Sequence, residues 1–301
     1  MSKKTAEDLI SPGELIYYAH ELDPDFDMLD FLGISDIHYG NPLFARKHLE
    51  RTLSFLNRPN VRAVLNGDLC ESTLKTSKGE IFKQVGSPED QRDAMSEILY
   101  PYRDKFLGAV DGNHENRIWN EAGIHIVRDI AKNLGIPYRP EGLLHKISFG
   151  NGNNNVNGRP FVFWLYQTHG YGGARTTSAK AIKVERTSTY IHADCYLMSH
   201  DHVVNTAPAV YLIPDPRTRA EKAQTKDTEE WYETGHRVGR VKAHRKMLVK
   251  TNAYLRWGGY SEMGGFPPTD LATPLIKMLT PKSVYWDELP DKPRQAIKVI
   301  V

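Results

Sequence analysis

Apolar runs of strand length alternate with segments of helical periodicity in the first half of the chain. Strands are expected at residues 28–34, 61–65 and 106–110. Helices are expected at residues 43–56, 87–100 and 118–134. The start of the second helix is marked by Ser87 followed by Pro88, since serine caps a helix well and proline suits its first position. This alternation predicts an α/β fold.

The second half of the chain has mostly the pattern of strands. Residues 143–149 and 161–166 read as strands, and the Gly/Asn-rich segment 150–155 between them predicts a hairpin. A helix is expected at residues 179–192, followed by a short strand at 195–198. From residue 203 onward the pattern is mostly that of strands, and the last is expected at residues 295–301.

The sequence divides into a short extension and one main domain. Residues 1–25 are polar and interrupted by prolines, so we expect an N-terminal extension with a short strand at residues 15–18. Residues 26–301 form the main domain. The charged segment at about 214–235 predicts a long loop or an insertion within it.

Composition excludes several classes of protein. A chain of 301 residues with 40% hydrophobic content can bury a sizeable core. The net charge of +2 does not indicate a nucleic-acid or membrane partner. Cys70 and Cys195 lie far apart, which argues against a disulfide scaffold or a thiolate zinc site. The sequence shows neither a signal-peptide pattern nor a run of roughly 18 apolar residues. We therefore expect a cytoplasmic protein with no membrane contact.

Five short clusters of side chains that bind hard divalent metals each follow an apolar run. They contain Asp36 and His38, Asp68, Asn113 with His114 and Glu115, His169, and His200 with His202. Carboxylate, amide and imidazole groups in this supply are what two adjacent divalent cations need. Because ligands of an open sheet gather at the carboxyl ends of its strands, clusters far apart in the sequence can meet. The order and spacing therefore predict a metallohydrolase.

The local spacing predicts how these side chains are aimed. Asp36 and His38 are expected on the same side of an extended chain, and His200 and His202 have the same i, i+2 relation. The glycine before Asp68 allows a sharp turn that aims the carboxylate inward. A carboxylate has two oxygens, so Asp68 can bridge two cations.

The series Asp-x-His, Gly-Asp, Gly-Asn-His-Glu, His-Gly and x-His-x-His lies between residues 31 and 204. It resembles the calcineurin-like metallophosphoesterase superfamily. The resemblance implies a β-sandwich flanked by helices, in α/β/β/α layers, and makes residues 26–301 a metallophosphoesterase domain. It implies one metal bound by Asp36, His38 and His202, a second bound by Asn113, His169 and His200, and Asp68 as the bridge.

The same resemblance implies that His114 contacts the substrate phosphate and protonates the leaving oxygen. It also implies that Glu115 holds this region by hydrogen bonds. The alternatives are that His114 is only adjacent to Asn113 and has no role in the reaction, and that Glu115 is a carboxylate that stabilises the start of a helix. We expect Asp111 to support the site through structure or hydrogen bonds rather than as a ligand.

Two positions depart from the pattern of the superfamily. Ser199 stands where the last motif usually has glycine; because serine is small, we expect little effect on metal binding, and its hydroxyl is a candidate neighbour of the metal. Glu71 replaces an aspartate or asparagine three residues after Asp68. The segments 169–173 and 258–261 resemble members encoded by phages and prophages.

The ligand set predicts the chemistry. Two divalent ions would hold a bridging hydroxide that attacks phosphorus directly, while His114 protonates the leaving group. Oxygen and nitrogen ligands favour Mn²⁺, with Fe, Zn²⁺ and Ni²⁺ as alternatives.

The predicted substrate is a phosphodiester, in a nucleic acid or a nucleotide. The phosphate-binding arginines that protein phosphatases of the superfamily carry beside these motifs are absent here. A basic cluster at residues 237–250 supplies Arg245 and Lys246 as candidate contacts to DNA or RNA. The competing interpretation of this cluster is a solvated strand edge that discourages aggregation.

Two other functions stay open. One is a phosphomonoesterase acting on a small phosphorylated metabolite, and the other is a non-catalytic scaffold on the same fold. Scaffold members typically lose His114 or several metal ligands, all of which this chain retains. The sequence does not identify a protein partner.

Overall fold

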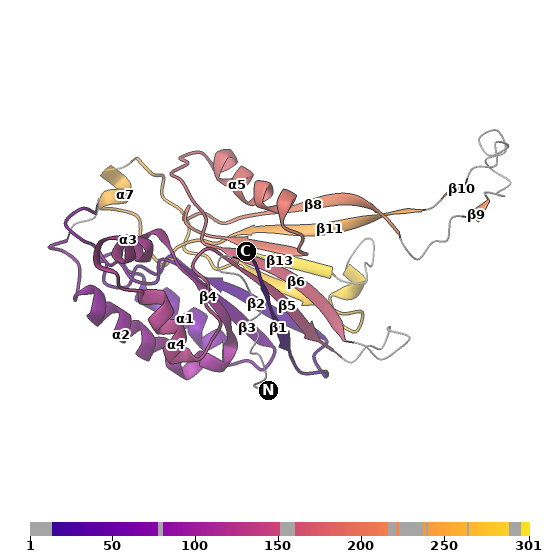
Figure 1. Ribbon diagram of the computed structural model, residues 1–301, viewed down its shortest axis with the longest axis horizontal. Helices are drawn as coiled ribbons and strands as arrows, with labels where there is room; N and C mark the ends of the chain where they lie inside the picture. The colour runs from indigo at the N-terminus through magenta and orange to yellow at the C-terminus, as the bar shows by residue number, and fades with distance from the viewer. Residues whose placement is uncertain are drawn as a thin grey trace, which may run out of the picture.

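The computed structural model describes residues 14–77, 81–150, 160–215, 221–222, 237–238, 240–263, 265–288 and 296–301. Two large β-sheets lie face to face at its centre (Figure 1). The first has the order β13-β12-β2-β3-β4. Its strands are β2 (Met28–Ile34), β3 (Val61–Asn66), β4 (Phe106–Val110), β12 (Leu275–Leu279) and β13 (Ala296–Ile300). Strands β2, β3 and β4 are parallel, so their carboxyl ends meet at one edge.

The second sheet has the order β1-β5-β6-β7-β11-β8. Its strands are β1 (Tyr17–Glu21), β5 (Leu143–Phe149), β6 (Phe161–Thr168), β7 (Cys195–Met198), β8 (Asn205–Pro214) and β11 (Val241–Lys250). The pair β5 and β6 is antiparallel, which confirms the predicted hairpin, although most of its turn lies outside the described residues. Strands β6, β7 and β11 run parallel to one another, so β6 and β7 deliver their carboxyl ends to the same place.

Alternation along the strands creates the layers. In β3, Val61, Ala63 and Leu65 face a cluster packed against helices, whereas Val64 faces the other sheet. The cluster shared by the two sheets joins Phe31 on β2 to residues of the second sheet such as Phe163. Successive side chains of a strand point to opposite faces of the sheet. The first sheet therefore buries one face against the helices and the other against the second sheet.

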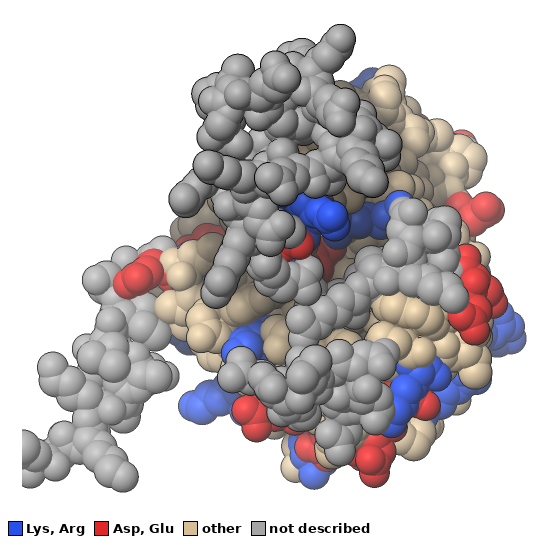
Figure 2. All heavy atoms as spheres, turned by 90° about the vertical axis from the view of Figure 1, so that its right-hand side faces the viewer, with Lys and Arg blue, Asp and Glu red and all other residues tan. Residues whose placement is uncertain are grey.

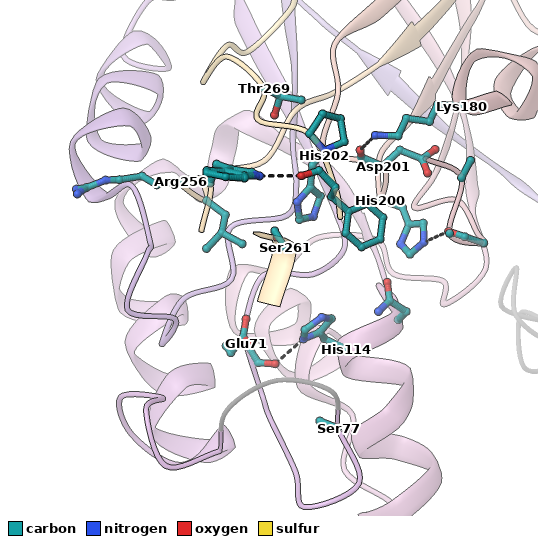
Figure 3. Close-up of a pocket in the computed structure, with 18 of the residues that line it drawn as sticks. Glu71, Ser77, His114, Lys180, His200, Asp201, His202, Arg256, Ser261 and Thr269 are labelled. Carbon is teal, nitrogen blue, oxygen red and sulfur yellow. Dashed lines mark hydrogen bonds between the residues drawn. The ribbon is translucent and has the colours of Figure 1, made fainter. Parts of the chain in front are cut away.

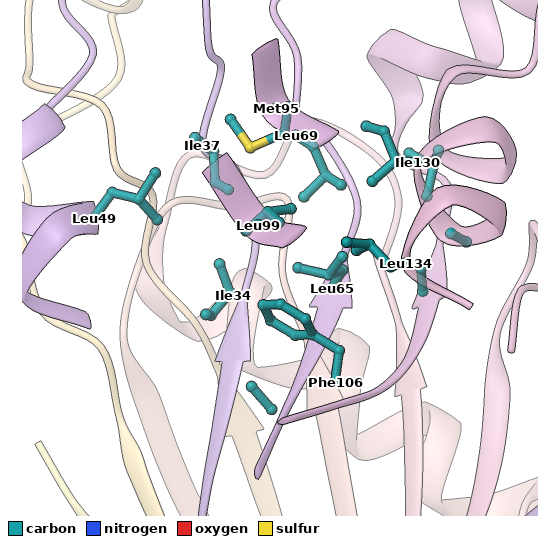
Figure 4. Close-up of a cluster of buried hydrophobic side chains, with 14 of the residues drawn as sticks. Ile34, Ile37, Leu49, Leu65, Leu69, Met95, Leu99, Phe106, Ile130 and Leu134 are labelled. Atoms are coloured by element: carbon teal, nitrogen blue, oxygen red, sulfur yellow. The ribbon is translucent and has the colours of Figure 1, made fainter. Parts of the chain in front are cut away.

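Helices cover the outer faces. They are α1 (Arg46–Phe55), α2 (Pro88–Leu99), α3 (Asn113–Ala122), α4 (Ile126–Leu134), α5 (Thr177–Tyr190) and the short α7 (Tyr260–Met263), with 3-10 turns at Tyr100–Lys105 and Trp286–Glu288. Residues of α1, α2 and α4 pack on the first sheet, as Figure 4 shows for Leu49, Met95 and Ile130. Helix α5 packs on the second sheet through Val184. The predicted α/β/β/α layers are therefore confirmed.

One predicted helix is two helices. The segment expected as a single helix over residues 118–134 breaks after Ala122, where Gly123 adopts a left-handed φ of 68°. Helix α4 then starts at Ile126. Apolar periodicity continues across the break, but a left-handed residue reverses the chain and ends the hydrogen-bond ladder. The helix predicted from Ser87 is confirmed, because the Ser87 side chain accepts a hydrogen bond from the Asp90 N–H.

The predicted N-terminal extension and the predicted insertion lie only partly within the described residues. Strand β1 pairs in parallel with β5, so the N-terminal segment adds an edge strand to the second sheet. Strands β8 and β11 form a long antiparallel ribbon that leads to the pair β9 (Glu221–Lys222) and β10 (Arg237–Val238) (Figure 1). Most of the insertion expected at 214–235 lies outside the described residues. Within the described chain, none of the helices has the length and apolar character needed to span a bilayer.

Candidate metal centre

The carboxyl ends of five strands bring the predicted ligands together. Asp36 follows β2, Asp68 follows β3 and Asn113 follows β4. His169 comes directly after β6, and the His200 to His202 segment follows β7. Because these strand ends meet at one end of the sandwich, residues up to 166 positions apart in the chain, such as Asp36 and His202, come into contact.

The ligand loops have an unusual backbone. Left-handed φ angles between 46° and 72° occur at six described non-glycine residues, namely Asp36, His38, Asp68, Ser72, His200 and His202. Five of these are predicted metal ligands, and such conformations cost of order 1–3 kcal/mol each. The extended geometry expected for the two i, i+2 pairs is therefore wrong, because the strands end before them. The pairs converge through tight turns instead.

Two glycines make room for this arrangement. Gly67 has a φ of 83°, and a Cβ there would lie 2.6 Å from the backbone nitrogen of Gly112. A Cβ on Gly112 would lie 2.0 Å from Oδ1 of Asp68. The loops after β3 and β4 therefore approach so closely that neither position accepts a larger side chain.

The first group of ligands joins the loops after β2 and β7. Nε2 of His202 lies 3.2 Å from Oδ1 of Asp36 and 3.3 Å from Nε2 of His38. Asp36 and His38 are buried, whereas His202 is partly exposed to the pocket. Oδ1 of Asp36 is buried without any hydrogen-bond partner, an arrangement that a bound cation would explain.

The second group surrounds Nε2 of His169. It lies 3.3 Å from Oδ2 of Asp68, 3.2 Å from Oδ1 of Asn113 and 3.3 Å from Nδ1 of His200. The same Asp68 oxygen is 4.0 Å from Nε2 of His38 in the first group. Asp68 therefore lies between the two groups.

The histidine tautomers leave lone pairs directed at each other. Nδ1 of His169 contacts the Asn66 carbonyl oxygen, and Nε2 of His200 contacts the Gly172 carbonyl oxygen. Since a carbonyl only accepts, these nitrogens carry a proton, and the opposite nitrogen of each ring is the one that can bind a cation once it is deprotonated. Nδ1 of His38 likewise faces the Glu71 carboxylate at 3.1 Å. Anchoring the outer nitrogen in this way is how proteins prepare histidine for a metal, so these residues fit a divalent cation.

Charge coupling in the group is strong. Burial by itself would raise the pKa of Asp36, but attraction to His202 and His169 lowers it to about 2. Burial would lower the pKa of His169, but Asp68 outweighs it and raises this pKa to about 10. In the absence of a cation the acids therefore hold protons on nearby imidazoles, and a metal must displace them.

His114 lies at the start of α3 beside this group. Its Nδ1 lies 2.6 Å from the Glu71 carbonyl oxygen, to which it donates, and its backbone N–H donates to Oδ1 of Asp68. Burial lowers the pKa of His114, but Asp68 and Glu71 outweigh burial and raise it above the ordinary value. Its Nε2 is then the nitrogen available to exchange a proton with a bound molecule.

Glu115 holds the loop after β3. Its carboxylate accepts hydrogen bonds from the backbone N–H groups of Asp68, Leu69 and Cys70. It also accepts from the Gly112 N–H at the start of its own helix, so the structure combines the two roles considered for it. Burial, together with the nearby Asp68, raises the pKa of Glu115 to about 7.

Asp111 and Asp201, the remaining acidic neighbours, have partners outside the ligand groups. Oδ2 of Asp111 accepts from the hydroxyl of Tyr138 at 2.7 Å, and burial raises the pKa of Asp111 to about 6. Asp201 forms ion pairs with Lys183 and Lys250. Both make structural contacts.

The hydroxyl of Ser199 connects two strands of different sheets. Its buried hydroxyl accepts hydrogen bonds from Nδ2 of Asn66 at 2.5 Å and from the hydroxyl of Thr251 at 2.8 Å. It therefore ties β3 to the end of β11, and its hydrogen bonds are made to these two residues.

Arg245 and Lys246 are not brought to the ligand groups. They lie in the middle of β11, and Lys246 is buried, with its ammonium donating to the Ser188 carbonyl and the Tyr196 hydroxyl. Lys246 is buried between α5 and β7, away from the ligand groups, so it is not available to a polyanion there and the expectation of a contact is wrong. The sequence pattern missed this because alternate residues of a ribbon face opposite sides. On the end of the molecule seen in Figure 2, basic and acidic side chains are interspersed.

The ligand groups open into a pocket of about 420 Å³. His114, His200 and His202 line its floor, as Figure 3 shows. Its walls include Arg117, Lys180 and Trp257, which the motif analysis did not single out. Arg117 had a signal, because it lies one helical turn after Asn113 and such residues share a face. The other two come from segments that only the fold brings together.

No known family model and no curated protein matches the chain. Among solved structures it is similar to Vacuolar Protein Sorting 29 of Cryptosporidium parvum, at 12% identity over 91% of this chain and 99% of that one, with a TM-score of 0.38. It is similar to a metallophosphoesterase of Sphaerobacter thermophilus, at 14% identity over 91% and 89%, with a TM-score of 0.33. A predicted phosphoesterase of Streptococcus pneumoniae matches at 11% identity over 84% and 83%, with a TM-score of 0.32.

These values are too low to establish a family. In its layers, and in the order of its metal-ligand motifs, the chain resembles the calcineurin-like metallophosphoesterase superfamily.

Proposed function

We propose that the protein is a metal-dependent phosphoesterase that hydrolyses phosphodiester bonds. The observation that carries this proposal is the convergence of imidazole lone pairs and buried carboxylate oxygens at the floor of an open pocket. These nitrogen and oxygen atoms repel one another electrostatically unless protons or cations lie between them. The pocket gives a substrate access to the same atoms.

The two groups suit two divalent ions. Asp36, His38 and His202 would hold one ion, and Asn113, His169 and His200 would hold the other, with Asp68 shared. When bound, the ions would activate water and neutralise charge on the phosphoryl oxygens. The absence of thiolate ligands favours Mn²⁺, and leaves Fe, Zn²⁺ and Ni²⁺ as alternatives.

The chain itself supplies the proton. His114 is held with Nδ1–H on the Glu71 carbonyl, so its imidazolium carries the second proton on Nε2. Asp68 and Glu71 favour the protonated ring by raising its pKa. His114 would donate this proton to the leaving oxygen of the ester, and a suitably placed acid contributes roughly 10²–10⁴ in rate.

A diester suits the pocket because its walls rise on more than one side of the ligand groups. Residues of the loop before α2, of α3, of α5 and of the segment 255–269 all line it. A diester carries an organic group on each of two ester oxygens, so it would contact two walls of the pocket at once. A monoester has one such group and would need only one wall. The alternative functions are a phosphomonoesterase and a non-catalytic scaffold.

Steady-state hydrolysis of bis(p-nitrophenyl) phosphate and p-nitrophenyl phosphate with Mn²⁺ tests the proposal. We expect a higher kcat/KM for the diester, and loss of both activities in Asp36→Ala. A preference for the monoester would support the phosphomonoesterase. No turnover with Mn²⁺, Fe²⁺, Zn²⁺ or Ni²⁺ would leave the scaffold.

A further inference from the structure

Two basic side chains that line the pocket have neutral hydrogen-bond partners. Arg117 donates to the hydroxyl of Ser77 at 2.7 Å, and Lys180 donates to the carbonyl oxygen of Asp201 at 3.0 Å. Over the part of the chain that the structure describes, no carboxylate lies within 4.0 Å of either cation. Both cations have neutral oxygens as hydrogen-bond partners. Burial lowers the pKa of Lys180 from its ordinary value, against the attraction of Asp201.

The charge around Lys180 is in excess. Asp201 is the carboxylate shared by this region, and it already pairs with Lys183 at 2.6 Å and Lys250 at 2.5 Å. Lys180 is almost completely buried, at 3% exposure, and is a third ammonium group beside Asp201, with Asp36 as a further acid that acts on Lys250. A buried surplus of positive charge is unfavourable unless an anion accompanies it.

The two cations lie on opposite sides of the ligand groups. In Figure 3, Lys180 lies at the upper end of the pocket, and Ser77, the partner of Arg117, lies at the lower end. His114 and His200 lie between them. The side chain of Arg256 points away from this line. A ligand that reached both cations would pass over the metal ligands.

An aromatic side chain completes the wall. The indole N–H of Trp257 donates to the Phe266 carbonyl oxygen at 2.7 Å, which fixes the ring without using its faces. Trp257 lines the pocket and is 45% exposed. Phe266 lines the same wall, and the guanidinium of Arg175 lies 5.9 Å from its ring centroid. A held but exposed indole is a surface on which a planar group stacks.

We infer that the pocket binds a single-stranded oligonucleotide. The inference rests on the proposed function and names its substrate class. The scissile phosphate lies at the metal ligands, the neighbouring phosphates bind Arg117 and Lys180, and a base stacks on Trp257. Unpaired cations that follow a backbone, combined with an aromatic platform, are the general means of holding single strands.

Competition against bis(p-nitrophenyl) phosphate hydrolysis by the Mn²⁺-loaded protein tests the inference. The competitors are (dT)10 and thymidine 5′-monophosphate, measured between 50 and 200 mM NaCl. Single strands lose affinity with a slope of about 0.7 per phosphate contact in a double-logarithmic plot. Two contacts therefore predict that the inhibition constant of (dT)10 rises by about sevenfold over this range through these residues alone.

Substitutions separate the contributions. R117Q should lower the salt slope by about 0.7, and R117Q with K180Q by about 1.4. W257A should raise the inhibition constant about five- to hundredfold with an unchanged slope, because stacking is not ionic. K132Q removes an exposed lysine of α4 and should change neither quantity. Arg117 is only partly buried, so R117Q gives a result even if K180Q does not fold.

The outcomes are distinguishable. Equal inhibition by (dT)10 and the mononucleotide, or a salt slope that R117Q leaves unchanged, would overturn the inference while the esterase activity stands. If no diester is hydrolysed, the proposed function fails. Fluorescence anisotropy of labelled (dT)10 with the same variants then decides the binding question directly.

Discussion

Nε2 of His169 lies 3.3 Å from Oδ2 of Asp68, while the other oxygen of Asp68 accepts the backbone N–H of His114 at 2.9 Å. One carboxylate thus connects a metal ligand of the second sheet with the proposed proton donor on α3. Oδ2 of Asp68 also lies 4.0 Å from Nε2 of His38. The position of Asp68 makes it common to both ligand groups.

Asp68→Asn should therefore disturb both metal sites at once. The amide keeps the size of the side chain but removes the charge that balances two cations. We expect metal analysis by mass spectrometry to give fewer than about one ion per chain, with turnover reduced by at least about 100-fold. Asp104→Asn, at an exposed position, serves as the control. Full occupancy of both sites in Asp68→Asn would rule out a shared ligand.

Glu71 should govern metal affinity without binding the metal itself. Its Oε2 accepts from Nδ1 of His38, and its Oε1 accepts from the hydroxyl of Thr73. Burial would raise the pKa of Glu71, but the hydrogen bond and charge of His38 lower it to about 2. Loss of such a partner typically weakens metal binding by about 10–100-fold.

We expect Glu71→Gln to raise the Mn²⁺ concentration for half-maximal activity by that factor, and to restore most of kcat at saturating Mn²⁺. Glu97→Gln, on the exposed face of α2, is the matched control. A kcat that stays low at every Mn²⁺ concentration would instead indicate that Glu71 takes part in the reaction.

His114→Ala should separate catalysis from metal binding. The imidazole touches the Glu71 carbonyl through Nδ1 and leaves Nε2 towards the pocket. We expect unchanged metal content, a loss of about 10²–10⁴ in kcat for diesters with alkoxide leaving groups, and a much smaller loss for p-nitrophenolate esters. A loss independent of the pKa of the leaving group would refute the role of proton donor.

The His20–His145 pair should make the fold sensitive to acid. Nε2 of His20 contacts Nδ1 of His145 at 3.0 Å, and Nε2 of His145 donates to Oε1 of Gln167 at 2.8 Å. Burial lowers the pKa of His20 to about 4, and burial together with His20 lowers that of His145 to about 3. Both rings are therefore neutral in the folded protein at pH values where the unfolded chain binds protons.

Stability is then complete above the unfolded pKa of 6.5 and falls as the pH decreases towards 4 and 3. Each histidine should cost about 1 kcal/mol of unfolding free energy between pH 7.5 and 5.5. We expect His20→Gln to reduce this acid loss, as measured by urea unfolding, whereas His192→Gln at an exposed position should not. An identical pH dependence in His20→Gln and the native protein would contradict the assignment.

The order of the motifs in the sequence was enough to predict the layers and that the candidate ligands meet at one end of the sandwich. Each ligand cluster follows an apolar run that becomes a strand, and parallel strands bring their carboxyl ends to one edge. That prediction needs only the periodicity of a strand and the rule that ligands gather at strand ends. The backbone of the ligand turns was not predictable in this way. Left-handed residues such as Asp36 and His200 are held by the surrounding structure and not by their own preferences.

Where the role of a residue depends on its neighbours in space, only the tertiary structure determines that role. Lys246 and Lys180 are both buried lysines within regular elements, yet Lys246 contacts Tyr196 and Lys180 lines the pocket. The sequence by itself determined which residues follow the strands, because hydrophobic periodicity is a local property. Only the tertiary structure decided which of the distant charges meet. The pairing of Asp201 with Lys183 and Lys250, and the contact of Lys180 with the Asp201 carbonyl oxygen instead of a carboxylate, depend on packing between α5 and β11.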